Sequence, residues 1–218
     1  MNYFLLFVFG TLPSFIWLLY FLRKDVHPEP NRMILLVFAA GMASALVALA
    51  AEQILFPLFA KVSFPLSGIL TLFIGVALVE ELAKYGAVSV TALKNKVIDE
   101  PIDIPLYFIV AGLGFAALEN VLVLLGTGTA LGAPEIAGLN VLRFLGAVFL
   151  HALVSGLFGY YVVQKRFFWG LVWATSLHGV FNWFILKEQG VFQFLIPAAI
   201  ILGLVIFMTR ILQRLKTQ

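Results

Sequence analysis

Long apolar runs separated by short polar breaks dominate the sequence. A helix needs about 20 apolar residues to cross a bilayer, and seven runs come close to that length: 3–22, 33–55, 67–92, 105–126, 139–163, 168–187 and 191–211. The breaks between them collect proline, glycine and charged residues at 23–32, 56–65, 94–105, 126–138, 164–166 and 187–190. The pattern predicts an all-α, polytopic bundle of about seven membrane-spanning helices. Because no break is long enough for a soluble domain, we expect residues 1–218 to form one transmembrane domain.

The composition agrees with a location in the cell membrane. Of the residues, 62% are hydrophobic and 11% are charged, whereas a soluble domain carries about a quarter charged residues. The absence of cysteine excludes disulfides, thiolate metal ligands and cysteine nucleophiles. The net charge of +3 needs no nucleic-acid partner, because the basic residues stand at predicted helix ends. The first run lacks the basic start and the small-residue cleavage site of a signal peptide, so we expect a retained helix.

Lysine and arginine residues in the breaks predict the orientation of the chain, because the cytoplasmic side of a membrane protein collects them. With seven spans, ten such residues fall on one side: Arg23, Lys24, Arg32, Lys94, Lys96, Lys165, Arg166, Arg210, Arg214 and Lys216. The other side receives only Lys61 and Lys187. We therefore expect the N-terminus outside the cell and the C-terminus in the cytoplasm.

Acidic residues, histidines and amides interrupt four of the predicted spans near their middles. The third span carries Glu80, Glu81 and Lys84, the fourth Glu119 and Asn120, the fifth His151, and the sixth His178 and Asn182. A charged side chain at a helix centre costs about 2.5–3.5 kcal/mol on insertion scales. A bundle can turn all of these groups inward, so their presence at similar depth indicates a function.

Helical spacing orders these groups further. Glu80 and Lys84 are four residues apart, so they share a face and can pair, whereas Glu81 points about 100° away, toward a different neighbour. His178 and Asn182 also project from one stripe. Each feature alone has a structural interpretation, because an ion pair or a buried amide can simply join two helices. Three carboxylates and two imidazoles at one depth, with a single lysine as the obvious cation, favour a site.

Other polar and small residues have simpler interpretations. Glu52, near the outer end of the second span, is expected to be interfacial or structural. Arg143, at the start of the fifth span, can extend its side chain to the surface. Glycines on the fourth and fifth spans allow neighbouring helices to approach closely: Gly112, Gly114, Gly156 and Gly159.

The polar set supports more than one chemistry. A carboxylate beside a histidine can take a proton from water and return it to a leaving amine, while a second histidine and an asparagine can donate hydrogen bonds to an oxyanion. The same groups can instead bind a divalent metal such as zinc. No H-E-x-x-H or G-x-S-x-G motif is present. Because carboxylate–histidine chains also relay protons, residue types alone leave a hydrolase and a proton- or cation-coupled transporter open.

The order of the motifs resembles the PrsW family of membrane proteases, within the wider superfamily of the CAAX prenyl proteases and Abi (CPBP) proteins. The E-E-x-x-K motif of that family is similar to residues 80–84. The matching segments, in chain order, are KDVHPEP at 24–30, EELAK at 80–84, DEPID at 99–103, GLGFAALEN at 112–120, HALVSGLFGY at 151–160 and HGVFN at 178–182. The resemblance spans most of the chain.

The resemblance implies an intramembrane endopeptidase that cleaves a membrane protein or peptide, with either a glutamate-type or a metal-dependent mechanism. The catalytic residues that it implies are Glu80, Glu81, Glu119, His151, His178 and Asn182. Glu119 stands where the prenyl proteases have the histidine of F-x-x-x-H, so His151 is the expected partner of the water-activating glutamate. Family members are implicated in cleaving a membrane-anchored anti-sigma factor. A non-catalytic, immunity-type protein that binds a membrane peptide is the remaining alternative.

Overall fold

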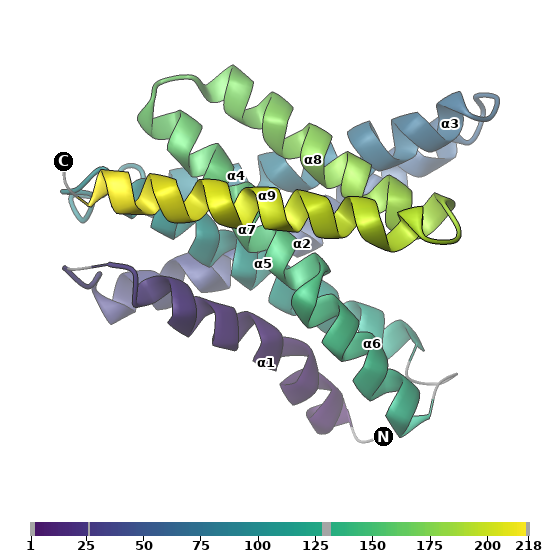
Figure 1. Ribbon diagram of the computed structural model, residues 1–218, viewed down its shortest axis with the longest axis horizontal. Coiled ribbons are helices and arrows are strands. Elements are labelled where there is room, and N and C mark those ends of the chain that lie inside the picture. The colour runs from purple at the N-terminus through teal and green to yellow at the C-terminus, as the bar shows by residue number, and fades with distance from the viewer. Residues whose placement is uncertain (1–2, 26, 128–131, 217–218) are drawn as a thin grey trace.

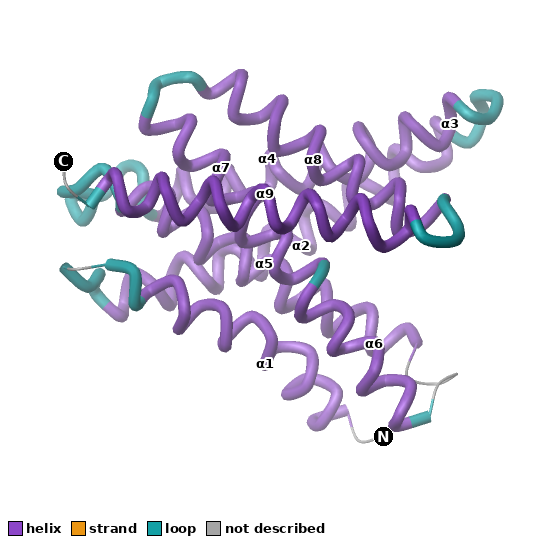
Figure 2. The backbone as a smooth tube through the Cα atoms, viewed as in Figure 1, coloured by secondary structure: helices purple, strands orange, loops and turns teal. Residues whose placement is uncertain are grey.

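The computed structural model describes residues 3–25, 27–127 and 132–216, and these are helical with no strand among them. The elements are α1 (Tyr3–Leu22), α2 (Asn31–Phe59), α3 (Leu66–Ile69), the π-helix η1 (Leu70–Leu78), α4 (Val79–Thr91), α5 (Asp103–Thr127), α6 (Ala133–Leu145), α7 (Ala147–Val163), α8 (Phe167–Lys187) and α9 (Phe192–Leu215). They form one bundle without sheet or separate lobe (Figures 1 and 2). The predicted all-α membrane bundle is confirmed.

Six of the helical segments described are long and apolar enough to cross a membrane. The remaining predicted span, the sixth at 168–187, is α8, which has sufficient length at 21 residues. Its apolar character is lower because it carries His178, Asn182 and three tryptophans. The chain is therefore a multi-pass membrane protein.

One predicted boundary is wrong. The fifth span begins at residue 133 rather than 139, because α6 and α7 form a single bent helical segment from Ala133 to Val163. The bend is at Gly146, where the backbone leaves helical geometry for one residue. Glycines and prolines at 126–138 had suggested a loop throughout, and residues 128–131 of that break lie outside the described part of the chain.

Helix α5 is the centre of the bundle, and 72% of its most apolar stretch is buried. It packs against α1, α2 and α7, with Phe108 and Leu113 fully enclosed. The predicted close approaches occur here. A side chain at Gly112 would collide with Ser155 and with the carbonyl oxygen of His151 on α7, and one at Gly114 would collide with the α2 backbone. Small residues thus bring α7, and His151 with it, against the central helix.

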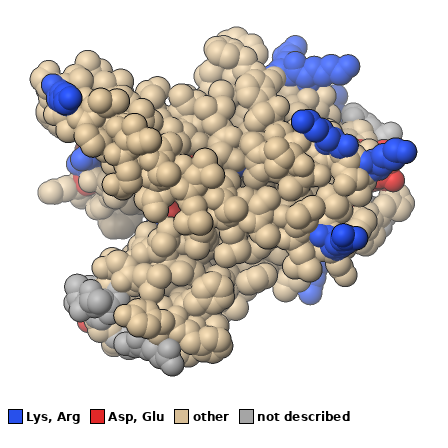
Figure 3. Space-filling model, turned by 180° about the vertical axis from the view of Figure 1, so that it is seen from behind, with Lys and Arg blue, Asp and Glu red and all other residues tan. Residues whose placement is uncertain are grey.

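Basic side chains gather at one end of the bundle, the end at which α9 finishes (Figure 3). We call this the basic end. The start of α1 lies at the opposite end (Figure 1), which agrees with an odd number of crossings. That the basic end faces the cytoplasm follows from the positive-inside rule and stays a prediction.

A cluster of carboxylates at the basic end ties the loop after α1 to α5. The Tyr107 hydroxyl donates a hydrogen bond to Glu29, and the Asp103 carboxylate accepts the backbone N–H groups of Asp99 and Glu100 at 3.0 and 2.8 Å. Burial raises the pKa of Glu29 to about 7; the Tyr107 hydrogen bond opposes this rise and the charge of Asp103 adds to it.

Candidate active site

The polar residues of three helices converge in the middle of the bundle. Glu80, Glu81 and Lys84 on α4 meet His151 on α7 and His178 on α8. All five are at least nine-tenths buried. The expectation that these residues share one depth and face one another is therefore confirmed.

The winding of the chain changes just before the glutamates. The nine residues of η1 form a π-helix, and regular α-helix resumes at Val79. Segments of π-helix are rare and are frequently found at functional sites.

Lys84 contacts both glutamates of α4 and His151 of α7. Its ammonium donates hydrogen bonds to Glu81 Oε1 and to His151 Nδ1, both at 2.7 Å. It lies 3.5 Å from Glu80 Oε2 and 4.4 Å from the centre of the Phe115 ring. Glu81 contacts a different neighbour, as expected, because its Oε1 lies 2.9 Å from His178 Nδ1; it also pairs with Lys84, since residues three apart are neighbours on a helix.

Each histidine has one ring nitrogen against a carboxylate. His178 Nδ1 lies 2.9 Å from Glu81 Oε1, and His151 Nε2 lies 2.9 Å from Glu119 Oε2. A carboxylate accepts hydrogen bonds, so these nitrogens carry the protons. Their opposite nitrogens then carry lone pairs. The lone pair on His151 Nδ1 receives the bond from Lys84, whereas that on His178 Nε2 remains open.

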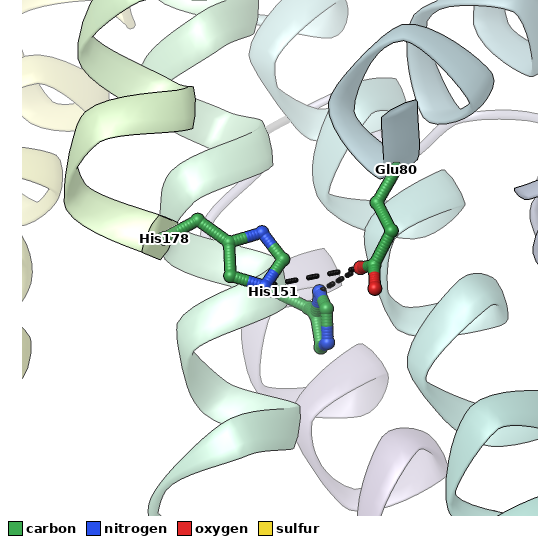
Figure 4. Close-up of side chains that lie close together, drawn as sticks. All are labelled: Glu80, His151 and His178. Carbon is green, nitrogen blue, oxygen red and sulfur yellow. Dashed lines mark ion pairs between the residues drawn. The ribbon is translucent and has the colours of Figure 1, made fainter. Parts of the chain in front are cut away.

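Glu80 is the group that these histidines face. Its Oε2 lies 3.8 Å from His178 Nε2 and 3.9 Å from His151 Nδ1, and the three side chains point toward one another (Figure 4). This oxygen is buried and, among the described residues, has the Lys84 ammonium at 3.5 Å but accepts no hydrogen bond. A buried polar atom without a hydrogen bond is costly, so the space beside Glu80 Oε2 suits a water, a proton or a cation.

A divalent metal would find three of its usual ligand types here. One atom each from Glu80, His151 and His178 lie within 4.8 Å of one another. Two ligands held about 2.1 Å from a tetrahedral zinc stand about 3.4 Å apart, which is close to the separations seen. The carboxylates behind both histidines are the supports that metal-binding histidines usually have. The residues therefore fit a metal, provided that Lys84 releases His151 Nδ1, because one lone pair cannot serve both.

Arg143 corrects an expectation drawn from its position in the sequence. It does not extend to the surface, since its side chain is only 16% exposed and its Nη2 lies 3.0 Å from Glu119 Oε1. Its Nε donates a hydrogen bond to the side-chain oxygen of Asn120. Glu119 contacts His151 through one carboxylate oxygen and Arg143 through the other. The glutamate therefore links these two residues.

Asn120 fixes the other side of this arrangement. Its amide donates to the carbonyl oxygen of Gly10 and to Asn140, both at 2.8 Å, and Asn140 in turn donates to the carbonyl oxygen of Phe9. The network joins α1, α5 and α6 at the level of the site. It holds Arg143 over Glu119 although the two come from different helices.

A cavity of about 550 Å³ opens onto the cluster, and Glu80, Glu119, His151, His178, Asn182, Arg143 and Glu52 are among its lining residues. Helices α2, α5 and α8 begin at the basic end, and their lining residues come from their second halves. The cavity therefore lies in the half of the bundle away from the basic end. Asn182 faces it one turn beyond His178, without a hydrogen bond to the cluster among the described residues.

The interfacial or structural role expected of Glu52 stays a prediction. Glu52 lines the wall of the same cavity as Glu80 and Glu119. It and Arg143 are the polar residues of the site that sequence reasoning set aside. The signal that could have identified both residues is a charge within an apolar span. The same signal identified Glu80, Glu81 and Glu119 as candidates.

Comparisons with known proteins agree with the motif order. A sequence model of the PrsW family, described as intramembrane metalloproteases, matches residues 29–211. The chain is 31% identical to Protease PrsW of Geobacillus kaustophilus over 192 residues, covering 83% of this chain and 79% of the relative. It is 26% identical to Protease PrsW of Bacillus subtilis, covering 88% of each chain, and 28% identical to that of Oceanobacillus iheyensis, covering 93% and 92%. No solved structure matches the chain.

Proposed function

The chain belongs to the PrsW family of intramembrane proteases, and from that premise we propose that it hydrolyses a peptide bond of a membrane-anchored protein with Glu80 as the base that activates water. The observation that carries the proposal is Glu80 Oε2, which accepts no hydrogen bond among the described residues and faces the ring nitrogens of two carboxylate-backed histidines. Membership in a protease family favours this reading over the transporter and the immunity-type alternative.

Glu80 Oε2 and His178 Nε2 are the acceptor atoms that can receive hydrogen bonds from a water, and they determine how that water is activated. A water beside Glu80 donates one hydrogen bond to its carboxylate and a second to His178 Nε2. These two hydrogen bonds turn the water's protons away from the substrate. A lone pair of the water then faces the carbonyl carbon that it attacks. Glu80 takes a proton as the bond to carbon forms and passes it to the leaving amine.

The remaining residues position this pair and receive the developing charge. Glu81 and Lys84 hold His178 and His151 in the orientations that face Glu80. The Asn182 amide lines the same cavity and donates a hydrogen bond to the oxyanion that forms on the substrate.

The metal named in the family's description, if bound, would be held by Glu80, His151 and His178 and would take the place of the hydrogen bonds that Glu80 and His178 otherwise accept from the water. When bound, it would lower the pKa of the water and polarise the substrate carbonyl. Its predicted dependence on the histidines is open to a direct test by binding: purified protein should take up zinc, and His178→Ala should lose it.

The cavity position indicates where the substrate is cut. The cavity lies in the half of the bundle away from the basic end, so the cleaved bond lies in, or just beyond, the membrane half that the positive-inside rule puts outside. A single-pass protein with an extended segment there suits this opening, and we propose a membrane-anchored anti-sigma factor as the substrate.

The proposal is tested by incubating purified protein in nanodiscs with candidate single-pass proteins, including a membrane-anchored anti-sigma factor, with and without a chelator. Products are identified by mass spectrometry. We expect cleavage by the wild type and by Glu135→Gln, a control at an exposed loop-side carboxylate, and at least 100-fold slower cleavage by Glu80→Gln. Full activity in a folded Glu81→Ala His178→Ala double variant would overturn the assignment.

A further inference from the structure

A second cavity, of about 330 Å³, lies near the basic end between α1 and α9. These two helices flank α7 on the front of the molecule (Figure 1), and α7 supplies the floor with Phe149 and Leu153. We call this the basic-end groove. It lies on the opposite face of α7 from the active site, because Phe149 and Leu153 are one turn apart and His151 is half a turn from each.

The rim of the groove is cationic. Arg23, Lys24 and Lys216 line it, and no aspartate or glutamate does. Within the described part of the chain, none of these three cations has a carboxylate at ion-pair distance. Lys24 is held by the Tyr20 ring, whose centre lies 4.5 Å from its ammonium. Three unpaired cations around one cavity call for an anion.

The interior of the groove is apolar. Leu153, Met208 and Leu212 on its surface are at least nine-tenths buried, and Phe149 stacks on Trp17 with ring centres 3.7 Å apart. Only Thr209 and Gln213 add uncharged polar groups on the α9 side. A soluble anion would satisfy the rim and leave this interior empty, whereas an amphiphile satisfies both.

We propose that the basic-end groove binds one anionic phospholipid, with its phosphate on Arg23, Lys24 and Lys216 and an acyl chain on Phe149 and Leu153. Basic pockets between membrane helices on the cytoplasmic side are suited to acidic lipid head groups. The site is independent of the proposed catalytic function, although its occupant packs against the helix that carries His151.

The experiment measures binding of phosphatidylglycerol and of phosphatidylcholine to the detergent-purified full chain by native mass spectrometry. The test variant is Arg23→Gln Lys24→Gln Lys216→Gln. The matched control is Lys94→Gln Lys96→Gln Arg210→Gln, which removes equal charge from exposed positions at the same end that do not line the groove. A second variant, Thr209→Trp, fills the groove without changing its charge.

We expect the wild type to retain one phosphatidylglycerol in preference to phosphatidylcholine. Each rim substitution alone should weaken binding about fivefold, and the triple variant at least 20-fold. Thr209→Trp should weaken binding comparably, and the control triple should change it less than threefold. Inorganic phosphate should not compete at millimolar concentration.

Three results would overturn the proposal. Equal loss in the control triple would mean diffuse attraction to a basic surface. Competition by inorganic phosphate would mean a site for a soluble anion. Undiminished binding to Thr209→Trp would place the lipid elsewhere. Thermal unfolding in neutral detergent shows which variants are folded, and the single substitutions provide the measurement if the triple variant is not.

Discussion

Replacing Arg143 by methionine tests how the site is held together. The substitution keeps much of the apolar stem while removing the ion pair to Glu119 at 3.0 Å and the hydrogen bond to Asn120. Bonds to charged groups are each worth about 1.5–3 kcal/mol when buried. Because Glu119 is 31% exposed to the cavity, we take the lower limit, about 1.5 kcal/mol, for the loss of the ion pair.

The expected effect on catalysis follows from the same contact. Glu119 binds His151 through its other oxygen, so a displaced Glu119 releases the imidazole that faces Glu80. A loss of about 1.5 kcal/mol corresponds to about tenfold in kcat. The assay is peptide cleavage in nanodiscs together with thermal unfolding, and the exposed Arg210→Met serves as control.

A double-mutant cycle decides whether Arg143 acts through Glu119. If it does, Arg143→Met should have much less effect in a Glu119→Gln background than in the wild type. Equal effects in both backgrounds, or wild-type activity and stability in Arg143→Met, would refute the role that we assign to this residue.

Three further predictions concern packing, pH and metal binding. Gly112→Ala should destabilise the protein by about 1–3 kcal/mol in thermal unfolding, because the added carbon meets α7 beside His151. The control Gly86→Ala has open space around it and should be neutral or stabilising. Equal effects of the two substitutions would contradict the packing described for Gly112. Since the folded-state pKa of Glu29 is raised to about 7, its contribution is complete below the unfolded pKa of about 4.5 and is lost as the pH rises to about 7, so melting temperatures should fall over that range and fall less in Glu29→Gln. Glu119→Gln should weaken zinc binding about 10–100-fold in equilibrium dialysis, as loss of a carboxylate behind a metal-binding histidine does; unchanged affinity would argue against His151 as a ligand.

The sequence predicted the membrane helices and the residues of the cluster because both leave one-dimensional signals. Apolar length marks the spans, and a charge within such a span is conspicuous. Depth along each helix then placed Glu80, His151 and His178 at one level, and the structure brings them together.

Contacts that depend on side-chain reach or on a bend were not predictable in this way. Lys84 was assigned to Glu80 alone, but it also pairs with Glu81, three residues away on the same helix. Arg143 was expected at a helix start, yet six residues of helix precede that expected start and a bend at Gly146 follows. Its contact with Glu119 is formed between residues 24 positions apart, and no local pattern records it.

The π-helix η1 joins α3 and α4 within one continuous helical span, Leu66–Thr91. Its i to i+5 bonding accommodates an extra residue, so deleting one residue within Leu70–Leu78 would move each preceding residue of the segment one position closer to Glu80. Glu80 and Glu81 would keep their places against His151 and His178, while Val76 on the cavity wall would be replaced by another side chain. A change of one codon here could therefore alter which substrates enter while leaving the hydrolytic groups aligned. Length variation at this segment is a route by which related proteases could diverge in substrate choice.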